Sequence, residues 1–212
     1  MKIAVIIEGS TKRRNGDVAG ALDGLGHEVF NLGMKNAEGE PDLTYVETGF
    51  LTALLLNLGA VDFVVGGCGT GQGYMNAVLQ FPGTACGLLV DSVDAFLFSR
   101  VNAGNCVSLA LNKGYGDLGG DLGLRHIFGQ LFHGERGEGY PAARKEIQAG
   151  AREKLARLSL AAHRAMKDIL PAMDREIVER ALSFPGVLDF IGEAPPSELK
   201  SHILALAKER QA

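Results

Sequence analysis

The 212-residue chain has no tryptophan, only three cysteines and seven prolines, and no strong excess of either charge. Three cysteines without a Cys-x-x-Cys pair argue against a disulfide framework and against a thiolate zinc site. Lys and Arg number 21 against 25 Asp and Glu, so the chain lacks the basic surface with which proteins bind nucleic acid. The low proline content and unperiodic glycines exclude collagen and low-complexity disorder.

Long hydrophobic runs are also missing. No stretch approaches the roughly 18 apolar residues that a membrane-spanning helix needs. The first residues, MKIAVIIEGS, read directly into a strand and lack the charged region and cleavage site of a signal peptide. We therefore expect a cytoplasmic protein with reduced cysteines that binds neither membranes nor nucleic acid.

Short apolar runs are abundant instead. Residues 3–7, IAVII, form a continuous β-branched run that meets a polar, glycine-containing segment, which is typical of a strand buried on both faces of a parallel sheet. Similar runs recur at 27–32, 61–66, 84–90 and 105–111, and they alternate with helix-length segments at 16–25, 42–58, 72–81, 92–103 and 118–133. The alternation predicts an α/β fold with a doubly wound, five-stranded parallel sheet.

The composition changes after about residue 140, where glycines become rare. Apolar residues then recur every three or four positions from Ile147 to Ile169, which predicts one amphipathic helix that Pro171 ends. Asp174 could cap a second helix, and a third should follow Ser197 with Leu199, Ile203 and Leu206 facing inward. We divide the chain into an α/β domain, residues 1–142, and an all-helical extension, residues 143–212, that packs on the first domain or on a partner subunit.

One predicted loop is the strongest candidate for chemistry. Five glycines lie within the eight residues 66–73, GGCGTGQG, after the third predicted strand and before a helix. Ligands of open α/β sheets bind beyond the carboxyl ends of the strands, and glycine amides at a helix start can face an anion. The loop is neither a Walker A motif nor a GxGxxG fingerprint.

Cys68 gives this loop a reactive group. A helix N-terminus lowers the pKa of a thiol, and a thiol that titrates near working pH suits a general base. The Thr70 hydroxyl and the Gly69 and Gly71 amides could then stabilise a developing oxyanion. The alternative is that Cys68 is a small buried residue, as we expect for Cys86 and Cys106 inside apolar runs.

Other polar groups are less specific. The basic residues Lys12, Arg13 and Arg14 follow the first strand at the same sheet edge as Cys68, where they could hold an anion or form a solvated loop. The five histidines share no ligand spacing, and the glycine-rich segment 114–123 has too few oxygen ligands for a metal loop, so we read it as the turn into the next helix.

Several segments together resemble the ribose-5-phosphate isomerase B and galactose-6-phosphate isomerase family over about residues 2–146. They are KIAVIIEG, VDFVVGGCGTGQG, the pair Ser99-Arg100 and Asn105, and the most specific is CGTGxG from Cys68 to Gly73. The resemblance implies a flavodoxin-like sheet and a dimer, or pair of dimers, with active sites between subunits. It also implies that an aldose phosphate and its ketose are interconverted without metal or organic cofactor.

The resemblance carries roles onto particular residues. The family's cysteine matches Cys68 and moves a proton between carbons 1 and 2 through an enediolate, while the residue matching Thr70 helps to hold the negative oxygen. Tyr45 matches a family tyrosine, Arg144 matches one of two C-terminal arginines, and Lys113 lies near a phosphate-binding arginine. The candidate substrate-binding residues are Gly69, Gly71, Gly73, Tyr45, Arg100, Asn105, Lys113, Arg144 and Arg13.

The chain also departs from the family pattern. Glu8-Gly9 stands where the family has Asp-His, and the histidine that helps to open the sugar ring has no counterpart, Asn102 being the nearest polar group. Tyr140 replaces the second C-terminal arginine. An amide cannot exchange protons near neutral pH as an imidazole can. Either the substrate is open-chain or differently substituted, or chemistry has been lost and a binding pocket remains.

The leading hypothesis is an aldose–ketose isomerase for a small sugar phosphate or a similar carbonyl compound. Cys68 would be the base, Thr70 with the loop amides the oxyanion site, and Glu8 with Asn102 would position hydroxyls. The partners expected are the substrate and a second copy of the chain. The alternatives are a non-catalytic sugar-phosphate-binding module and, third, a thiol hydrolase with Cys68 as nucleophile.

Overall fold

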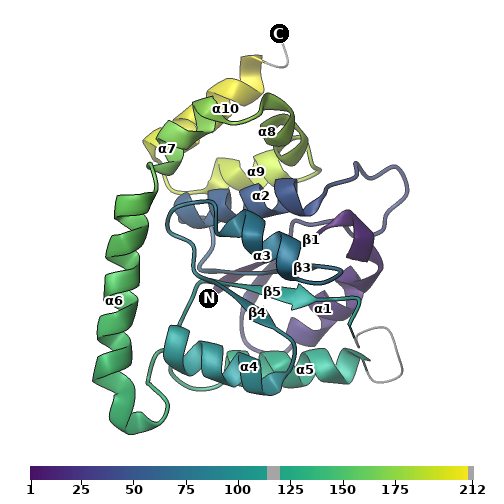
Figure 1. Cartoon of the computed structure of the whole chain (residues 1–212). Coiled ribbons are helices and arrows are strands. Elements are labelled where there is room, and N and C mark those ends of the chain that lie inside the picture. Colours follow the sequence, from purple (N-terminus) through teal and green to yellow (C-terminus); the bar gives the residue numbers. More distant parts are fainter. Residues whose placement is uncertain (114–119, 210–212) are drawn as a thin grey trace.

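The computed structural model describes residues 1–113 and 120–209 and contains the predicted parallel sheet (Figure 1). The strands are β1 (Lys2–Ile7), β2 (Glu28–Asn31), β3 (Phe63–Cys68), β4 (Cys86–Leu89) and β5 (Cys106–Ala110). In the described chain they pair in parallel in the order β2-β1-β3-β5-β4. The expected α/β fold is therefore confirmed, although β3 lies two residues later than predicted and includes Cys68.

The strand order reverses between β1 and β3, which are neighbours at the centre of the sheet. Ile7, the last residue of β1, pairs with Gly67 of β3, and Cys68 pairs with Ala110 of β5. The carboxyl ends of three strands therefore meet at one edge. This reversal is the place where open α/β sheets bind ligands.

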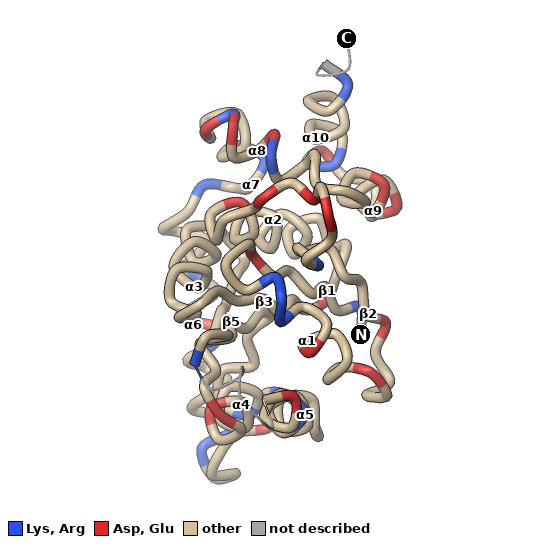
Figure 2. Tube along the Cα trace, turned by 90° about the vertical axis from the view of Figure 1, so that its right-hand side faces the viewer, with Lys and Arg blue, Asp and Glu red and all other residues tan. Residues whose placement is uncertain are grey.

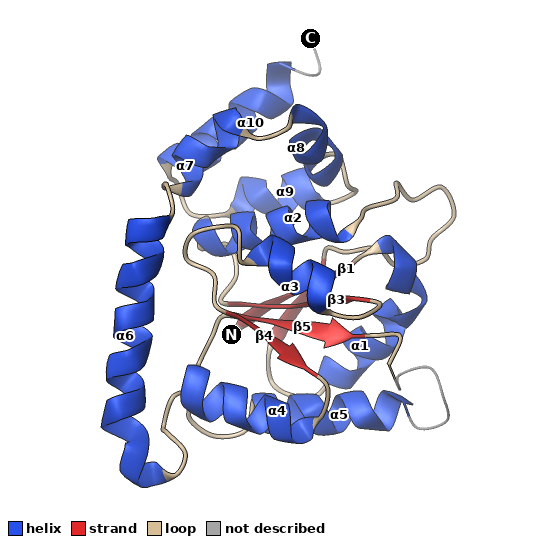
Figure 3. Cartoon of the chain, viewed as in Figure 1, coloured by secondary structure: helices blue, strands red, loops and turns tan. Residues whose placement is uncertain are grey.

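Helices cover both faces of the sheet (Figure 3). One face carries α1 (Asn15–Leu22), α4 (Ser92–Leu97) and α5 (Gly120–Leu131), and the other carries α2 (Tyr45–Asn57) and α3 (Gln72–Val78). Ile3, Val5 and Ile7 of β1 belong to the first core, whereas Ala4 and Ile6 belong to the second. Because both faces are buried, the strand sequences are continuously apolar rather than alternating.

Short turns join some of these elements. η1 (Gly9–Arg14) follows β1, and η2 (Phe98–Asn102), a π-helical turn, precedes β5. η3 (Ala142–Arg144) leads into the helical extension. The predicted glycine-rich turn at 114–123 lies in part outside the described residues, and its last four residues begin α5.

The extension contains α6 (Lys145–Ala162), α7 (Met166–Ile169), η4 (Leu170–Ala172), α8 (Arg175–Leu182), α9 (Val187–Glu193) and α10 (Glu198–Glu209). From α7 to α10, the extension forms a third layer over α2 (Figure 1). Met166, Leu182 and Ile203 share one buried core with Phe50 of α2. Asp174 caps α8 as predicted, by accepting a hydrogen bond from the Glu176 amide at 2.9 Å.

The single helix predicted from Ile147 to Ile169 is interrupted. His163 has extended backbone angles (φ −116°, ψ 148°), so α6 ends there and α7 starts separately. Met166 and Leu170 are buried on the α2 layer, and the chain reaches that layer only by turning away from α6. α6 stands apart from the rest (Figure 3), and its predicted apolar stripe is exposed, with Ile147 at 67% and Leu158 at 61%.

Two smaller differences concern the end of the chain. α9 was not predicted, and it begins after Gly186, whose φ of 83° makes the turn from α8. Leu199 and Ile203 of α10 are buried as expected, but Leu206 is 40% exposed because α10 extends beyond the layer it packs on. None of the described helices has the length and hydrophobicity to span a bilayer.

Candidate active site

Glu8 is the first residue beyond β1 and is almost fully buried. Its carboxylate accepts a hydrogen bond from the Ser10 amide at 3.1 Å and a short one from the Ser10 hydroxyl. The Thr11 hydroxyl lies 3.4 Å from the same carboxylate. Glu8 therefore caps η1 and fixes the Ser10 hydroxyl beside the end of β3.

The cysteine loop, residues 66–73, begins inside β3. Cys68 is 6% exposed, and its carbonyl accepts hydrogen bonds from the amides of Gly71 at 3.2 Å and Leu111 at 3.0 Å. Gly71 has a φ of 74°, and a methyl group there would lie 2.4 Å from Leu88. At Gly67 a methyl group would lie 2.4 Å from the Leu109 carbonyl oxygen. Part of the glycine content is thus required by the close packing of the loop on β5.

The loop opens to solvent directly beyond the cysteine, because Gly69 is half-buried and Thr70 is exposed. Among the described residues, the Gly69 and Thr70 amides have no hydrogen-bond acceptor. The Gly71 amide, predicted to face an oxyanion, is instead bonded within the turn. The donors available to a substrate are therefore the Gly69 amide, the Thr70 amide and the Thr70 hydroxyl. The oxygen of that hydroxyl lies 3.4 Å from the Gln72 amide nitrogen.

Three other segments converge on this loop. A methyl group at Gly69 would lie 2.8 Å from Asn112 Nδ2 and 3.7 Å from Ser10 Oγ. At Gly73 it would lie 3.1 Å from the ring of Tyr45, which is half-exposed. The structure therefore brings together the turn after β1, the start of α2 and the end of β5 at the cysteine loop. Asn112 was not among the candidates, although its position just after a strand at this edge was a usable signal.

Cations lie at the same edge, on η1 and after β5 (Figure 2). Lys12 pairs with Asp42 at 3.8 Å and Arg14 pairs with Asp17 at 3.7 Å. Arg13 is exposed and makes no ion pair with any described residue, and the exposed Lys113 follows Asn112. Arg13 and Lys113 are thus the cations available to an anionic ligand here.

Four predicted site residues lie at the opposite edge. Asn105 precedes β5, and its side chain accepts from the Ala85 amide at 2.8 Å and donates to the Gly83 carbonyl at 2.7 Å. Arg100 in η2 is buried, donates to the Glu135 carbonyl at 2.9 Å and pairs with Glu138 at 3.0 Å. Both side chains hold loops at the amino ends of the strands rather than standing free.

Asn102 and Arg144 are exposed and lie on the same amino side, at η2 and at the start of α6. The Arg152 guanidinium ties α6 to η2 by donating to the Val101 carbonyl at 2.8 Å. A strand of five residues spans roughly 15 Å. Within one chain these four residues are therefore separated from Cys68.

The two other cysteines are away from this edge. Cys106 is fully buried, and burial, together with the neighbouring Cys86, raises the pKa of its thiol well above the usual value. Cys106 is thus the buried structural residue that the sequence predicts, and Cys86 is half-buried. Over residues 1–113 and 120–209, no three His, Cys, Asp or Glu side chains gather as metal ligands would.

Comparisons with known proteins identify the family and agree with the fold. The family model described as Ribose/Galactose Isomerase matches residues 3–121. The crystal structure of a 4-deoxy-L-threo-5-hexosulose-uronate ketol-isomerase complexed with a tartrate is 38% identical, covers 98% of this chain and 100% of that chain, and has a TM-score of 0.92. Ribose-5-phosphate isomerase from Vibrio parahaemolyticus is 40% identical, covers 97% of this chain and 99% of that chain, and also has a TM-score of 0.92.

A more distant structure shares the fold. Type B ribose 5-phosphate isomerase from Leishmania infantum is 16% identical, covers 76% of this chain and 98% of that chain, and has a TM-score of 0.63. No curated protein sequence matches the chain. The two more similar structures extend over nearly the whole chain and therefore include the helical extension.

Proposed function

The chain belongs to the ribose/galactose isomerase family and is a sugar isomerase, and from that premise we propose that Cys68 is the base of an aldose–ketose isomerisation. The observation that carries this proposal is the position of Cys68. It ends β3 at the reversal of strand order, next to the Gly69 and Thr70 amides, which have no acceptor within the described part of the chain. Cys68 also belongs to the buried core on the α2 side of the sheet. Proton transfer requires a base beside oxyanion donors, and the thiol is the base that this loop supplies.

The proposed reaction moves one proton between two adjacent carbons. The Cys68 thiolate removes the proton from the carbon next to the carbonyl, and the electron pair forms an enediolate. The Gly69 and Thr70 amides and the Thr70 hydroxyl stabilise its negative oxygen. Cys68 then returns the proton to the neighbouring carbon, and the hydroxyl proton changes oxygen. Glu8 holds the Ser10 hydroxyl where it can orient the substrate.

The substrate we propose is a small acidic sugar, such as a sugar phosphate, whose anionic group lies near Arg13 and Lys113. One feature favours an open-chain form over a ring: Asn102 stands nearest to the position of the family's ring-opening histidine. A 4-deoxy-5-hexosulose-uronate, the substrate named for one similar structure, has no hydroxyl on carbon 4 or 5 to close a ring. Such a compound needs no ring-opening group, whereas ribose 5-phosphate does.

We further propose that the enzyme is a homodimer whose sites are completed across the interface. Asn102 and Arg144 are exposed and lie too far from Cys68 in their own chain, so they could act only on the site of a second copy. Arg100 and Asn105 hold loops of their own chain. The exposed apolar stripe of α6, including Leu155 at 58% and Leu158 at 61% exposure, also fits a face that a second copy covers. The alternative, a non-catalytic binding module, needs no such completion.

Cys68→Ala tests the proposed base. We expect turnover to fall by roughly 10²–10⁴-fold while binding of a substrate analogue persists. The assay is solvent-deuterium exchange at the carbon next to the carbonyl, with ribose 5-phosphate and 4-deoxy-L-threo-5-hexosulose-uronate as the two substrates. Cys86→Ala, which removes a half-buried thiol outside the loop, is the matched control. Unchanged exchange in Cys68→Ala would refute the assignment, and thermal shifts without exchange in the native protein would favour the binding module.

Mixing two inactive variants tests the shared site. Arg144→Ala and Cys68→Ala, unfolded together and refolded at equal concentrations, should regain about one quarter of the native activity, because half of the dimers are mixed and each has one intact site. No recovery above the separate variants would show that Arg144 does not act across an interface. Arg164→Ala, which removes an exposed arginine beyond the end of α6, is the control partner.

A further inference from the structure

The segment Asp42–Tyr45 borders the proposed active site from the side of α2. The Gly9 amide donates to the Leu43 carbonyl at 2.8 Å, and a methyl group at Gly9 would lie 2.6 Å from the Asp42 carboxylate. At its other end, Tyr45 covers Gly73 of the cysteine loop. The segment therefore touches both the turn that carries Glu8 and the loop that carries Cys68.

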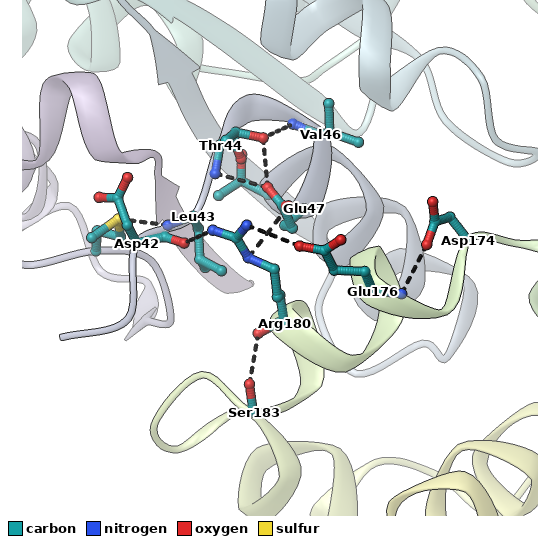
Figure 4. Close-up of polar contacts among 11 residues, drawn as sticks. Asp42, Leu43, Thr44, Val46, Glu47, Asp174, Glu176, Arg180 and Ser183 are labelled. Carbon is teal, nitrogen blue, oxygen red and sulfur yellow. Dashed lines mark hydrogen bonds and ion pairs between the residues drawn. The ribbon is translucent and has the colours of Figure 1, made fainter.

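One side chain of the helical extension reaches this segment. Arg180 of α8 donates to the Asp42 carbonyl, 138 residues away in the sequence (Figure 4). Its Nε lies 3.7 Å from Glu47 Oε1, and its Nη1 lies 3.5 Å from Glu176 Oε1. Arg180 thus joins the third layer to both ends of the turn that starts α2.

Glu47 presents a fixed carboxylate to the Arg180 guanidinium. It is buried, and its Oε2 accepts hydrogen bonds from the Thr44 amide at 2.8 Å and the Thr44 hydroxyl at 2.5 Å, which forms a capping box for α2. Burial alone would raise the pKa of Glu47, but the hydrogen bonds from Thr44 and the backbone, together with Arg180, outweigh it and lower the pKa. The carboxylate is therefore charged when it faces the guanidinium.

We propose that Arg180 is a positioning residue of the isomerase: through Asp42 and Glu47 it fixes the segment that holds Tyr45 over the cysteine loop. The helical extension then sets one wall of the site without contacting the substrate. The catalytic part of this inference rests on the proposed function, because it takes the cysteine loop as the place of catalysis. The positional part concerns Tyr45 alone and can be measured without activity.

The absence of tryptophan gives a direct probe of the position of this segment. In a Tyr45→Trp variant the single tryptophan reports on the segment Asp42–Tyr45 itself. We expect Arg180→Ala, added to this variant, to raise the acrylamide quenching constant of that tryptophan roughly twofold as the segment loosens. Arg180→Lys keeps the charge near Glu47 but loses the planar fork, so it should restore the quenching in part. Lys167→Ala, which removes an exposed ion pair with Glu198 elsewhere in the extension, should leave it unchanged.

Kinetics of the same substitutions, made with Tyr45 in place, test the consequence for catalysis. Arg180→Ala should raise KM roughly five- to tenfold with kcat changed less than about twofold, because it loosens a binding wall and leaves the base in place. Unchanged quenching in Arg180→Ala overturns the proposal whatever the activity. Altered quenching with KM and kcat both unchanged overturns it as well. Full activity in Cys68→Ala would instead refute the proposed function, and the quenching result would stand.

Discussion

A buried pair of hydroxyls beneath the cysteine loop gives a sharp test of how this region is held. The Tyr74 ring is fully buried, and its hydroxyl lies 2.5 Å from the Thr52 hydroxyl of α2. The Thr52 hydroxyl also donates to the Thr48 carbonyl at 2.8 Å. A threonine has one hydroxyl hydrogen, so Tyr74 must be the donor to Thr52. The bond joins α2 to α3, the helix into which the cysteine loop leads.

The two obvious substitutions remove the same bond at different cost. Tyr74→Phe deletes the donor and leaves Thr52 bonded to the Thr48 carbonyl, so we expect a loss of about 1 kcal/mol in the free energy of unfolding. Thr52→Val keeps the volume but leaves the Tyr74 hydroxyl buried without a partner, which costs about 1–3 kcal/mol. The double variant replaces both groups by apolar ones of the same shape and should cost no more than Thr52→Val alone.

Urea unfolding at one fixed protein concentration measures all three variants, because the apparent stability of any oligomer depends on concentration. For a chain of this length each kcal/mol corresponds to roughly 2–4 °C in Tm, so a thermal scan gives a second estimate. The hydrogen bond between Tyr74 and Thr52 is refuted if Tyr74→Phe lowers the free energy of unfolding by more than Thr52→Val does. It is also refuted if the two losses simply add in the double variant. Additivity would mean that the two hydroxyls do not interact.

The remaining predictions concern two glycines and the exposed stripe of α6. Gly67→Ala should prevent folding or lower the free energy of unfolding by more than about 3 kcal/mol, since the Leu109 backbone cannot move away. Gly20→Ala in α1, with open space around it, should raise that free energy by about 0.5–1 kcal/mol. Equal melting temperatures of the two variants would contradict this. Leu158→Glu on the α6 stripe should halve the mass measured by light scattering. Leu160→Glu, at 78% exposure on another face of α6, should not, and equal effects of the two would exclude the stripe as the interface.

The α/β fold was predictable because its signal is local. Each strand is a continuous apolar run, and each run is followed by a helix-length segment, so the parallel sheet follows from the connection rules alone. The extension was harder. The stripe from Ile147 to Ile169 keeps helical spacing through the bend at His163, and spacing does not record that Met166 packs on α2 while Leu158 faces solvent.

The candidate site was predictable only in part. Cys68 was found from its loop, whereas Glu8 and Tyr45 came from the family resemblance; topology brings all three to one sheet edge, since Glu8 follows β1, Cys68 ends β3 and Tyr45 begins α2. Asn105 and Arg100 were chosen from the family resemblance, which carries residue types but not the subunit that supplies them. Arg180 had no sequence signal, because its contact with Asp42 joins segments 138 residues apart.

The glycines of the cysteine loop differ in how strictly packing requires them. A methyl group at Gly66 would lie 2.1 Å from the buried Tyr74, and those at Gly67 and Gly71 would meet Leu109 and Leu88, so packing alone requires these three glycines. At Gly69 a methyl group would meet the exposed Asn112 and Ser10 side chains, and at Gly73 it would meet the half-exposed Tyr45 ring. These side chains can move, so a methyl group at Gly69 or Gly73 would cost less than one at the other three positions. Packing therefore accounts for all five glycines, most strictly for Gly66, Gly67 and Gly71, whose neighbours are buried or backbone atoms.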